Sequence, residues 1–215
     1  MKSLFIEMRK KFNDKEINLS VLDKLEGKTV SLAASVQYLD LILKIKKYLE
    51  SKGKKVIIKQ GSFHKAQVLG CQSFAFDSKA DILLLLADGK FHAINNAVEL
   101  SREIFIFNTK TIEKITKEEI EKIKARTKAK ISKFLMNDKI GLIISSKPGQ
   151  RYNNYIEIEK KLENKGKQVY LFEADNINPQ ELENFPIEIW INTACPGLSS
   201  DSSKILNLRD VINYI

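Results

Sequence analysis

The sequence predicts an α/β protein of two similar small doubly wound domains, with mainly parallel sheets, related by an internal repeat. A segment beginning at Val30 and another beginning at Ile143 share a strand, a polar loop, a helix, Lys-Gly-Lys and a second strand. Matching residues lie 113 positions apart in the pairs Gln37 and Gln150, Gly53 and Gly166, and Val56 and Val169. The glycine after each helix suits the left-handed position that ends a helix. The strands are continuously apolar, as in a parallel sheet covered on both faces.

The other elements follow from local patterns. Strands are predicted over 81–87, 104–107 and 188–192, and helices over 93–101 and 208–214. Thr116 and Glu119 form a capping box that begins a long amphipathic helix over 116–136. The apolar stripe of this helix is predicted to be Ile120, Ile123, Ile131 and Leu135. We expect one domain over 28–136 and a second over 137–215, preceded by an extension over 1–27 that contains a strand and a short helix.

Composition narrows the class of protein. The 215 residues are 43% hydrophobic, which is enough for a core and excludes a disordered chain. No apolar run approaches the ~20 residues of a membrane span, and the N-terminus lacks the features of a signal peptide, so a cytoplasmic protein without membrane contact is expected. The net charge of +9 comes mainly from lysines beside glutamates on helices. Basic and aromatic residues do not alternate, so nucleic acid is not an expected partner.

The two cysteines are too few for a disulfide framework or for a closed four-thiolate metal site. Cys195 directly follows the predicted strand 188–192 and precedes Pro-Gly, a constrained position that suits a ligand or a nucleophile. Cys71 lies in the loop VLGCQSF. Burial as a small apolar side chain remains the alternative for both. In doubly wound folds ligands bind at the carboxyl ends of strands, which selects the loops 33–38, 87–93, 145–154 and 193–201.

Two of these loops carry polar side chains. ADGKFHA places Asp88, Lys90 and His92 after a strand; His92 could be a base, a ligand or a residue of the helix start, and a structural role is favoured. The loop SSKPGQRYNN, with Gly149 and the following helix start, could cradle an anion, but it is neither a Walker loop nor a dinucleotide fingerprint. His64 has no partner nearby in sequence and is expected to be structural.

Four segments together resemble the archaeal 3-amino-3-carboxypropyl transferase of diphthamide synthesis. They are VQYLDLILKIKKYLESKGKKV, QVLGC ending at Cys71, ADGKFH at 87–92, and WINTACPGLSSD around Cys195. This family has three related α/β domains, and each supplies one cysteine to a 4Fe–4S cluster. The resemblance covers the second and third domains, and residues 1–27 resemble the end of the first.

The resemblance implies the chemistry of the site. Cys71 and Cys195 would ligate the 4Fe–4S cluster, whose open iron engages S-adenosylmethionine in radical chemistry. A 3-amino-3-carboxypropyl group would then pass to a histidine of translation elongation factor 2, the first step to diphthamide. The residues expected around the cofactors are Gln37, Asp88, Lys90, His92, Gln150 and Asp201.

The chain departs from the family pattern in ways that leave three alternatives. The first domain and its cysteine are absent, and Ala87, Lys90 and Ala93 stand where the family tends to have Gly, Arg and Pro. A separate chain could supply the missing domain, or the protein could be a noncatalytic paralogue that acts as a binding or scaffold module of the translation machinery. Two copies could also pool their four cysteines. A homo- or hetero-oligomer is expected in the first and third cases.

Overall fold

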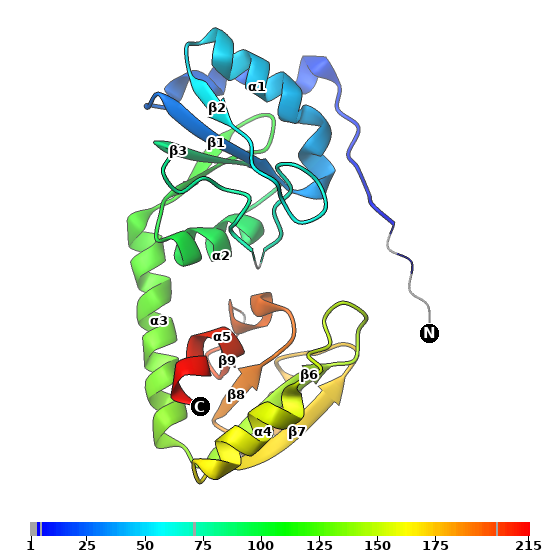
Figure 1. Cartoon of the computed structure of the whole chain (residues 1–215), viewed down its shortest axis with the longest axis vertical. Helices are drawn as coiled ribbons and strands as arrows, with labels where there is room; N and C mark the ends of the chain where they lie inside the picture. Colours follow the sequence, from blue (N-terminus) through cyan, green and yellow to red (C-terminus); the bar gives the residue numbers. More distant parts are fainter. Residues whose placement is uncertain (1–3, 5, 71, 201) are drawn as a thin grey trace. The chain divides into compact units, whose positions relative to one another are not determined.

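The computed structural model describes residues 4, 6–70, 72–200 and 202–215 (Figure 1). The chain divides into two compact units, Met1–Lys122 and Ile123–Ile215. This division falls within α3 (Lys117–Met136), whereas the expected domain boundary lies just after that helix. Among the described residues, no helix is long and apolar enough to cross a membrane.

The first unit is built on a five-stranded sheet in the order β2-β1-β3-β4-β5. Its strands are β1 (Thr29–Ala34), β2 (Lys55–Ile57), β3 (Ile82–Leu86), β4 (Ile104–Phe107) and β5 (Ile112–Ile115). The first four are parallel, and β5 runs antiparallel to β4. Every residue of β3 is buried. Its alternate side chains enter two cores, one with α1 (Ile42–Ser51) and one with α2 (Phe91–Leu100), so both faces of the sheet are covered.

The second unit has a four-stranded, wholly parallel sheet in the order β7-β6-β8-β9. Its strands are β6 (Lys139–Ser145), β7 (Gln168–Ala174), β8 (Ile189–Asn192) and β9 (Ile205–Asn207). The helices α4 (Tyr155–Asn164) and α5 (Leu208–Val211) contribute Ile158, Leu162 and Val211 to one of its cores. The other core gathers around Trp190. These two mainly parallel sheets confirm the predicted fold class.

The two repeats match in spacing from the helix to the second strand, but they differ in spacing from the first strand to the helix. Helices α1 and α4, and the starts of β2 and β7, are separated by 113 residues as predicted, and Gly53 and Gly166 both have positive φ, 76° and 78°. Thr29 pairs with Lys55, 26 residues later, but Lys139 pairs with Gln168, 29 residues later. The second unit therefore has three extra residues between its first strand and its helix. The alignment of Val30 with Ile143 is wrong for this reason.

Several predicted elements need correction. Residues 6–13 form no strand, and the first regular elements are the short 3-10 helices η1 (Asp14–Glu16) and η2 (Leu19–Lys24). Strands β5 and β9 are not among the predicted elements; IEKI alternates apolar and charged residues, and ILN is only three residues long. The last predicted helix consists of α5 followed by the 3-10 helix η6 (Ile212–Tyr214). Leu135 does not belong to the apolar stripe of α3, because its side chain is exposed. The neighbouring Phe134 is buried in the core instead.

Candidate functional site

Cys195 lies where the sequence places it, at the carboxyl end of a buried strand. β8 ends at Asn192, and Cys195 immediately precedes the 3-10 helix η5 (Pro196–Ser200). The residue is a free cysteine of intermediate exposure. Its backbone carbonyl accepts hydrogen bonds from the Asn192 side chain at 2.8 Å and from the Leu198 N–H at 3.1 Å. The thiol is therefore carried by a short loop whose backbone is well anchored.

Among the described residues, Cys195 is suited to be one of the ligands of an iron–sulfur cluster. Thiolates are the usual protein ligands of such clusters, and the partly exposed Cys195 offers one. The described ranges contain no group of three or more His, Cys, Asp and Glu side chains that could hold a metal ion. Cys71 and Asp201, two of the predicted site residues, lie outside the described residues. The 215 residues contain two cysteines in all, Cys71 and Cys195.

Asp88 and Lys90 follow β3 but engage different partners. The Asp88 carboxylate accepts a short hydrogen bond from the Tyr38 hydroxyl and one from Lys10 Nζ at 3.1 Å. Burial favours the neutral acid, but these two donors outweigh it and hold the pKa of Asp88 below its ordinary value. Lys90 Nζ pairs with Glu119 at 2.9 Å instead, and that carboxylate raises the pKa of Lys90. Both charges are therefore present at neutral pH.

The other predicted site residues lie in three different places. His92 is in the first turn of α2 and partly buried, and this burial lowers its pKa. Gln37 is exposed in the 3-10 helix η3 (Val36–Leu41), where its carbonyl accepts from the Lys10 N–H at 3.1 Å. Lys10 thus links Gln37 with Asp88. Gln150 is exposed in the loop after β6.

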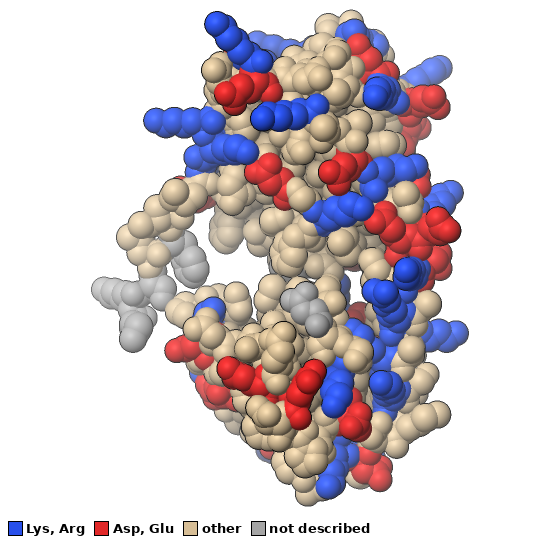
Figure 2. All heavy atoms as spheres, turned by 180° about the vertical axis from the view of Figure 1, so that it is seen from behind, with Lys and Arg blue, Asp and Glu red and all other residues tan. Residues whose placement is uncertain are grey.

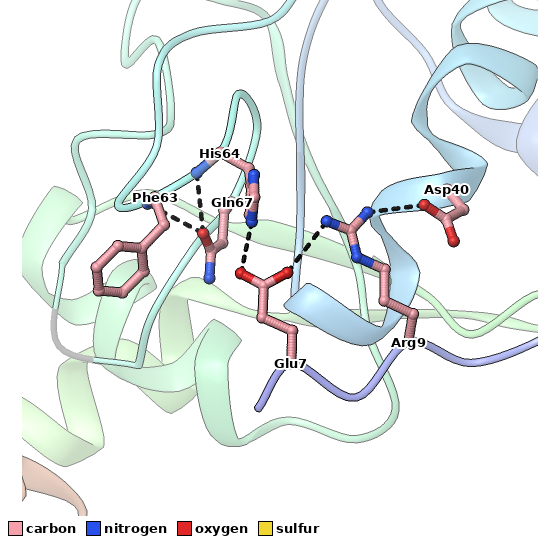
Figure 3. A network of polar contacts seen from close by, with 6 residues as sticks. All are labelled: Glu7, Arg9, Asp40, Phe63, His64 and Gln67. Atoms are coloured by element: carbon pink, nitrogen blue, oxygen red, sulfur yellow. Dashed lines mark hydrogen bonds and ion pairs between the residues drawn. The ribbon is translucent and has the colours of Figure 1, made fainter. Parts of the chain in front are cut away.

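The N-terminal segment contributes polar contacts that the sequence did not predict. Glu7 lies between an imidazole and a guanidinium, with Oε1 2.5 Å from His64 Nε2 and Oε2 3.2 Å from Arg9 (Figure 3). Arg9 also pairs with Asp40 at 2.7 Å. His64 thus has a partner in the fold, although none lies nearby in the sequence. Its partner is 57 residues away in sequence, too far for any local pattern to reveal.

The charged side chains of the surface are of both signs. On the face drawn in Figure 2, Lys and Arg side chains are interspersed with Asp and Glu. Many of the basic residues have an acidic partner, as in the pairs Lys44–Asp14, Lys52–Asp23 and Lys161–Glu157. These ion pairs neutralise part of the basic charge of the surface.

Comparison with known proteins assigns the family. A family model described as "Putative diphthamide synthesis protein" matches residues 1–206. The chain belongs to this diphthamide-synthesis family. It is 31% identical over 214 residues to the 2-(3-amino-3-carboxypropyl)histidine synthase of Methanocaldococcus jannaschii, across 94% of this chain and 57% of that protein. The corresponding synthase of Pyrococcus horikoshii is 30% identical over 190 residues, across 86% of this chain and 54% of that protein.

Solved structures of the diphthamide-synthesis family agree with this fold. The crystal structure of Dph2 from Pyrococcus horikoshii matches with a TM-score of 0.77 at 28% identity, over 90% of this chain and 59% of that one. The same protein with a 4Fe–4S cluster matches with a TM-score of 0.76, over 90% and 58%. The chain spans somewhat more than half the length of these relatives.

Proposed function

We propose that this chain is part of an enzyme that transfers a 3-amino-3-carboxypropyl group from S-adenosylmethionine to a histidine of elongation factor 2. This is the first step of diphthamide synthesis. Membership in the family and the names of the relatives support the reaction. The observation that carries the proposal is Cys195, held at the carboxyl end of β8 in a chain that matches a 4Fe–4S protein over 90% of its length.

In this proposal Cys195 and Cys71 supply two of three thiolates to the cluster. A cluster bound by three cysteines keeps one iron open for S-adenosylmethionine and supplies the radical chemistry that cleaves it. A third thiolate is needed, and the sequence has no further cysteine. We therefore propose a hetero-oligomer in which a partner chain carries the missing first domain, of which residues 1–27 are a remnant. The two domains of this chain would be 28–136 and 137–215.

The proposed contacts to S-adenosylmethionine come from all four of the loops 33–38, 87–93, 145–154 and 193–201. Gln37, Asp88, Lys90 and His92 are the candidates in the first domain, and Gln150 and Asp201 in the second. S-adenosylmethionine carries an ammonium and a carboxylate, which an aspartate and a lysine can pair with. In this structure Asp88 pairs with Lys10, and Lys90 pairs with Glu119. Both ion pairs are partly exposed, so solvent competes with them and a ligand could exchange for their partners.

A second candidate is a noncatalytic module that binds a component of the translation machinery. The engagement of Asp88 and Lys90 by residues of the same chain favours this alternative. It predicts a folded protein that takes up no iron and still binds its partner.

Anaerobic reconstitution tests the two proposals. The full chain is incubated with iron and sulfide, alone and with a chain that carries the first domain, and bound iron and the electron paramagnetic resonance spectrum are measured. We expect stable iron only in the mixture, its loss in Cys195→Ser, and its retention in the exposed control Ser203→Ala. Transfer to elongation factor 2 should appear in the same mixture. Absence of iron in every mixture would overturn the cluster proposal and support the noncatalytic module.

A further inference from the structure

Two buried asparagines lie side by side beneath the loop that carries Cys195. Asn192 ends β8 and Asn207 ends β9, and the two are paired in the register of these neighbouring strands (Figure 1). They are only 2% and 5% exposed. The side chains bond to each other, with Asn192 Nδ2 donating to Asn207 Oδ1 at 2.8 Å. Two amides at the ends of adjacent strands thus form one buried polar pair.

Each member of this pair also bonds to the thiol loop. Asn192 Oδ1 accepts from the Ala194 N–H at 2.9 Å, and its Nδ2 donates to the Cys195 carbonyl at 2.8 Å. Asn207 Nδ2 donates to Ser199 Oγ at 2.8 Å and to the Pro196 carbonyl at 3.3 Å. The backbone just before and just after Cys195 is therefore held by two side chains from the sheet.

A lysine holds the far end of the same loop. Lys130, within α3, donates from Nζ to the Ser199 carbonyl at 2.6 Å and to the Ile205 carbonyl at 3.0 Å. Its ammonium is partly buried, which lowers its pKa. Because these two carbonyls belong to η5 and β9, Lys130 ties the thiol loop to the strand that carries Asn207. The loop is anchored at both ends.

The orientation of Asn207 indicates a role beyond the stability of its own element. Asn207 stands at the N-cap position of α5, where an asparagine side chain ordinarily accepts from the first turn of the helix. No such capping hydrogen bond is made. The amide turns instead toward Asn192, Ser199 and Pro196. Residues behind the metal ligands commonly set ligand orientation in this way.

We propose that Asn192 is a positioning residue that presets the backbone of Cys195, with its own amide held in place by Asn207, so that the Cys195 thiolate meets a bound cluster with little rearrangement. The inference rests on the proposed function, in which Cys195 is a cluster ligand. It adds that the ligand is presented by a buried amide pair within this chain, before any partner supplies its own cysteine.

Replacing each asparagine by aspartate separates positioning from simple burial. Asn207→Asp keeps the oxygen that accepts from Asn192 Nδ2, so the bonds of Asn192 to Ala194 and Cys195 remain, while the donor to Ser199 Oγ and the Pro196 carbonyl is lost. In Asn192→Asp a carboxylate oxygen replaces Nδ2, the donor to the Cys195 carbonyl and to Asn207 Oδ1. The new oxygen faces these two acceptors and cannot bond to either. Both substitutions bury a carboxylate at nearly the same depth, so a merely structural role predicts similar effects from the two.

Two measurements on the full chain read out the difference. The first is the alkylation rate of Cys195 by iodoacetamide, without iron and in a Cys71→Ser background, so that one thiol reports. We expect faster alkylation in Asn192→Asp and a nearly unchanged rate in Asn207→Asp. The second uses the iron-loaded mixture with Cys71 intact. Asn192→Asp should lose iron to a chelator about 10-fold faster and change the paramagnetic resonance spectrum, as the loss of an outer-shell partner does elsewhere.

Controls keep the result decisive. Ile158→Val, in the core of the same unit, lowers stability without touching the loop and should leave both measurements unchanged. If Asn192→Asp does not fold, Asn192→Ser replaces it: faster alkylation supports the proposal, and an unchanged rate overturns it. Equal effects of the two aspartates also overturn it. If the wild-type mixture binds no iron, the proposed function fails, while the alkylation comparison still decides the positioning of Cys195.

Discussion

The hydroxyl of Tyr38 donates a hydrogen bond to the carboxylate of Asp88, fifty residues further along the chain at the carboxyl end of β3. The ring of Tyr38 is buried, and Lys10 Nζ lies 5.4 Å from its centroid while also pairing with Asp88. Burial and the neighbouring carboxylate raise the pKa of Tyr38, so the phenol remains a donor at every physiological pH. This contact joins η3 to the end of the central strand.

Tyr38→Phe should lower the free energy of unfolding by about 1 kcal/mol at pH 7, since Asp88 is exposed enough to regain water. The pKa of Asp88 is lowered in the folded protein: burial opposes the shift, and the bonds from Tyr38 and Lys10 outweigh it. A carboxylate of lowered pKa stabilises above its unfolded pKa, and this contribution is lost as the pH falls through the folded value. The difference between wild type and Tyr38→Phe should therefore persist to about pH 4 and shrink below it.

Urea denaturation between pH 7 and pH 3 measures this difference. Tyr170→Phe is the matched control, because Tyr170 is an exposed tyrosine of β7 and should change stability by less than about 0.5 kcal/mol. A Tyr38→Phe difference that stays constant down to pH 3 would contradict the role assigned to Asp88.

His92 should make the protein less stable in mild acid. Burial lowers its pKa, so its contribution to stability is complete above the unfolded value of about 6.5 and is lost as the pH falls. His92→Gln should therefore flatten the fall in unfolding free energy between about pH 6.5 and pH 5. Thermal unfolding across this range measures the slope. A profile of His92→Gln that falls as steeply as that of the wild type would refute the assignment to His92.

The local patterns of the sequence predict what depends on near neighbours. The capping box of α3 forms as expected, with the Glu119 N–H bonded to Thr116 Oγ1 at 3.2 Å and the Thr116 N–H to Glu119 Oε2 at 2.9 Å. The position of Cys195 was also predictable from near neighbours. An apolar run predicts the strand that ends at Asn192, and the Pro-Gly that follows Cys195 marks a loop. The glycines that end α1 and α4 are also found at positive φ.

Contacts between distant residues could not be predicted in this way. The partner of Asp88 is fixed only when η3 packs beside β3, and the partner of Glu7 only when the N-terminal segment reaches His64. The pairing of Asn192 with Asn207 likewise depends on β9, whose three residues carry too little periodicity to identify a strand. The candidate site was thus predictable in its cysteine and not in the polar groups that hold it.

Thr116→Ala should lower the free energy of unfolding by about 1 kcal/mol, because the first turn of α3 loses the hydroxyl that accepts from Glu119 N–H. Thr127→Ala is the matched control in the interior of the same helix, where alanine is the better helix former and stability should stay equal or rise slightly. Urea denaturation followed by circular dichroism compares the two. Equal losses from both substitutions would show that the capping box does not stabilise the helix.

Gly141 of β6 should not tolerate alanine, because it lies opposite Trp190 of β8 in the parallel register. A Cβ at Gly141 would fall 2.0 Å from Trp190 Cε3. The indole is 1% exposed and packs edge-on against Phe172 and Phe185, so it has no free direction in which to move. We expect Gly141→Ala to cost about 2–3 kcal/mol of unfolding free energy. Since Trp190 is the only tryptophan of the chain, its fluorescence should report the displacement directly.

A double-mutant cycle with Trp190→Leu assigns this cost to the contact. Trp190→Leu should itself be destabilising, but adding Gly141→Ala to it should cost much less than it does in the wild type, because the ring that blocks the new Cβ is gone. Gly53→Ala is the control: its Cβ would meet no atom within 4 Å, and its loss of about 1 kcal/mol from positive φ should not depend on Trp190. If the cost of Gly141→Ala is the same with and without Trp190, strand geometry rather than the indole excludes the side chain.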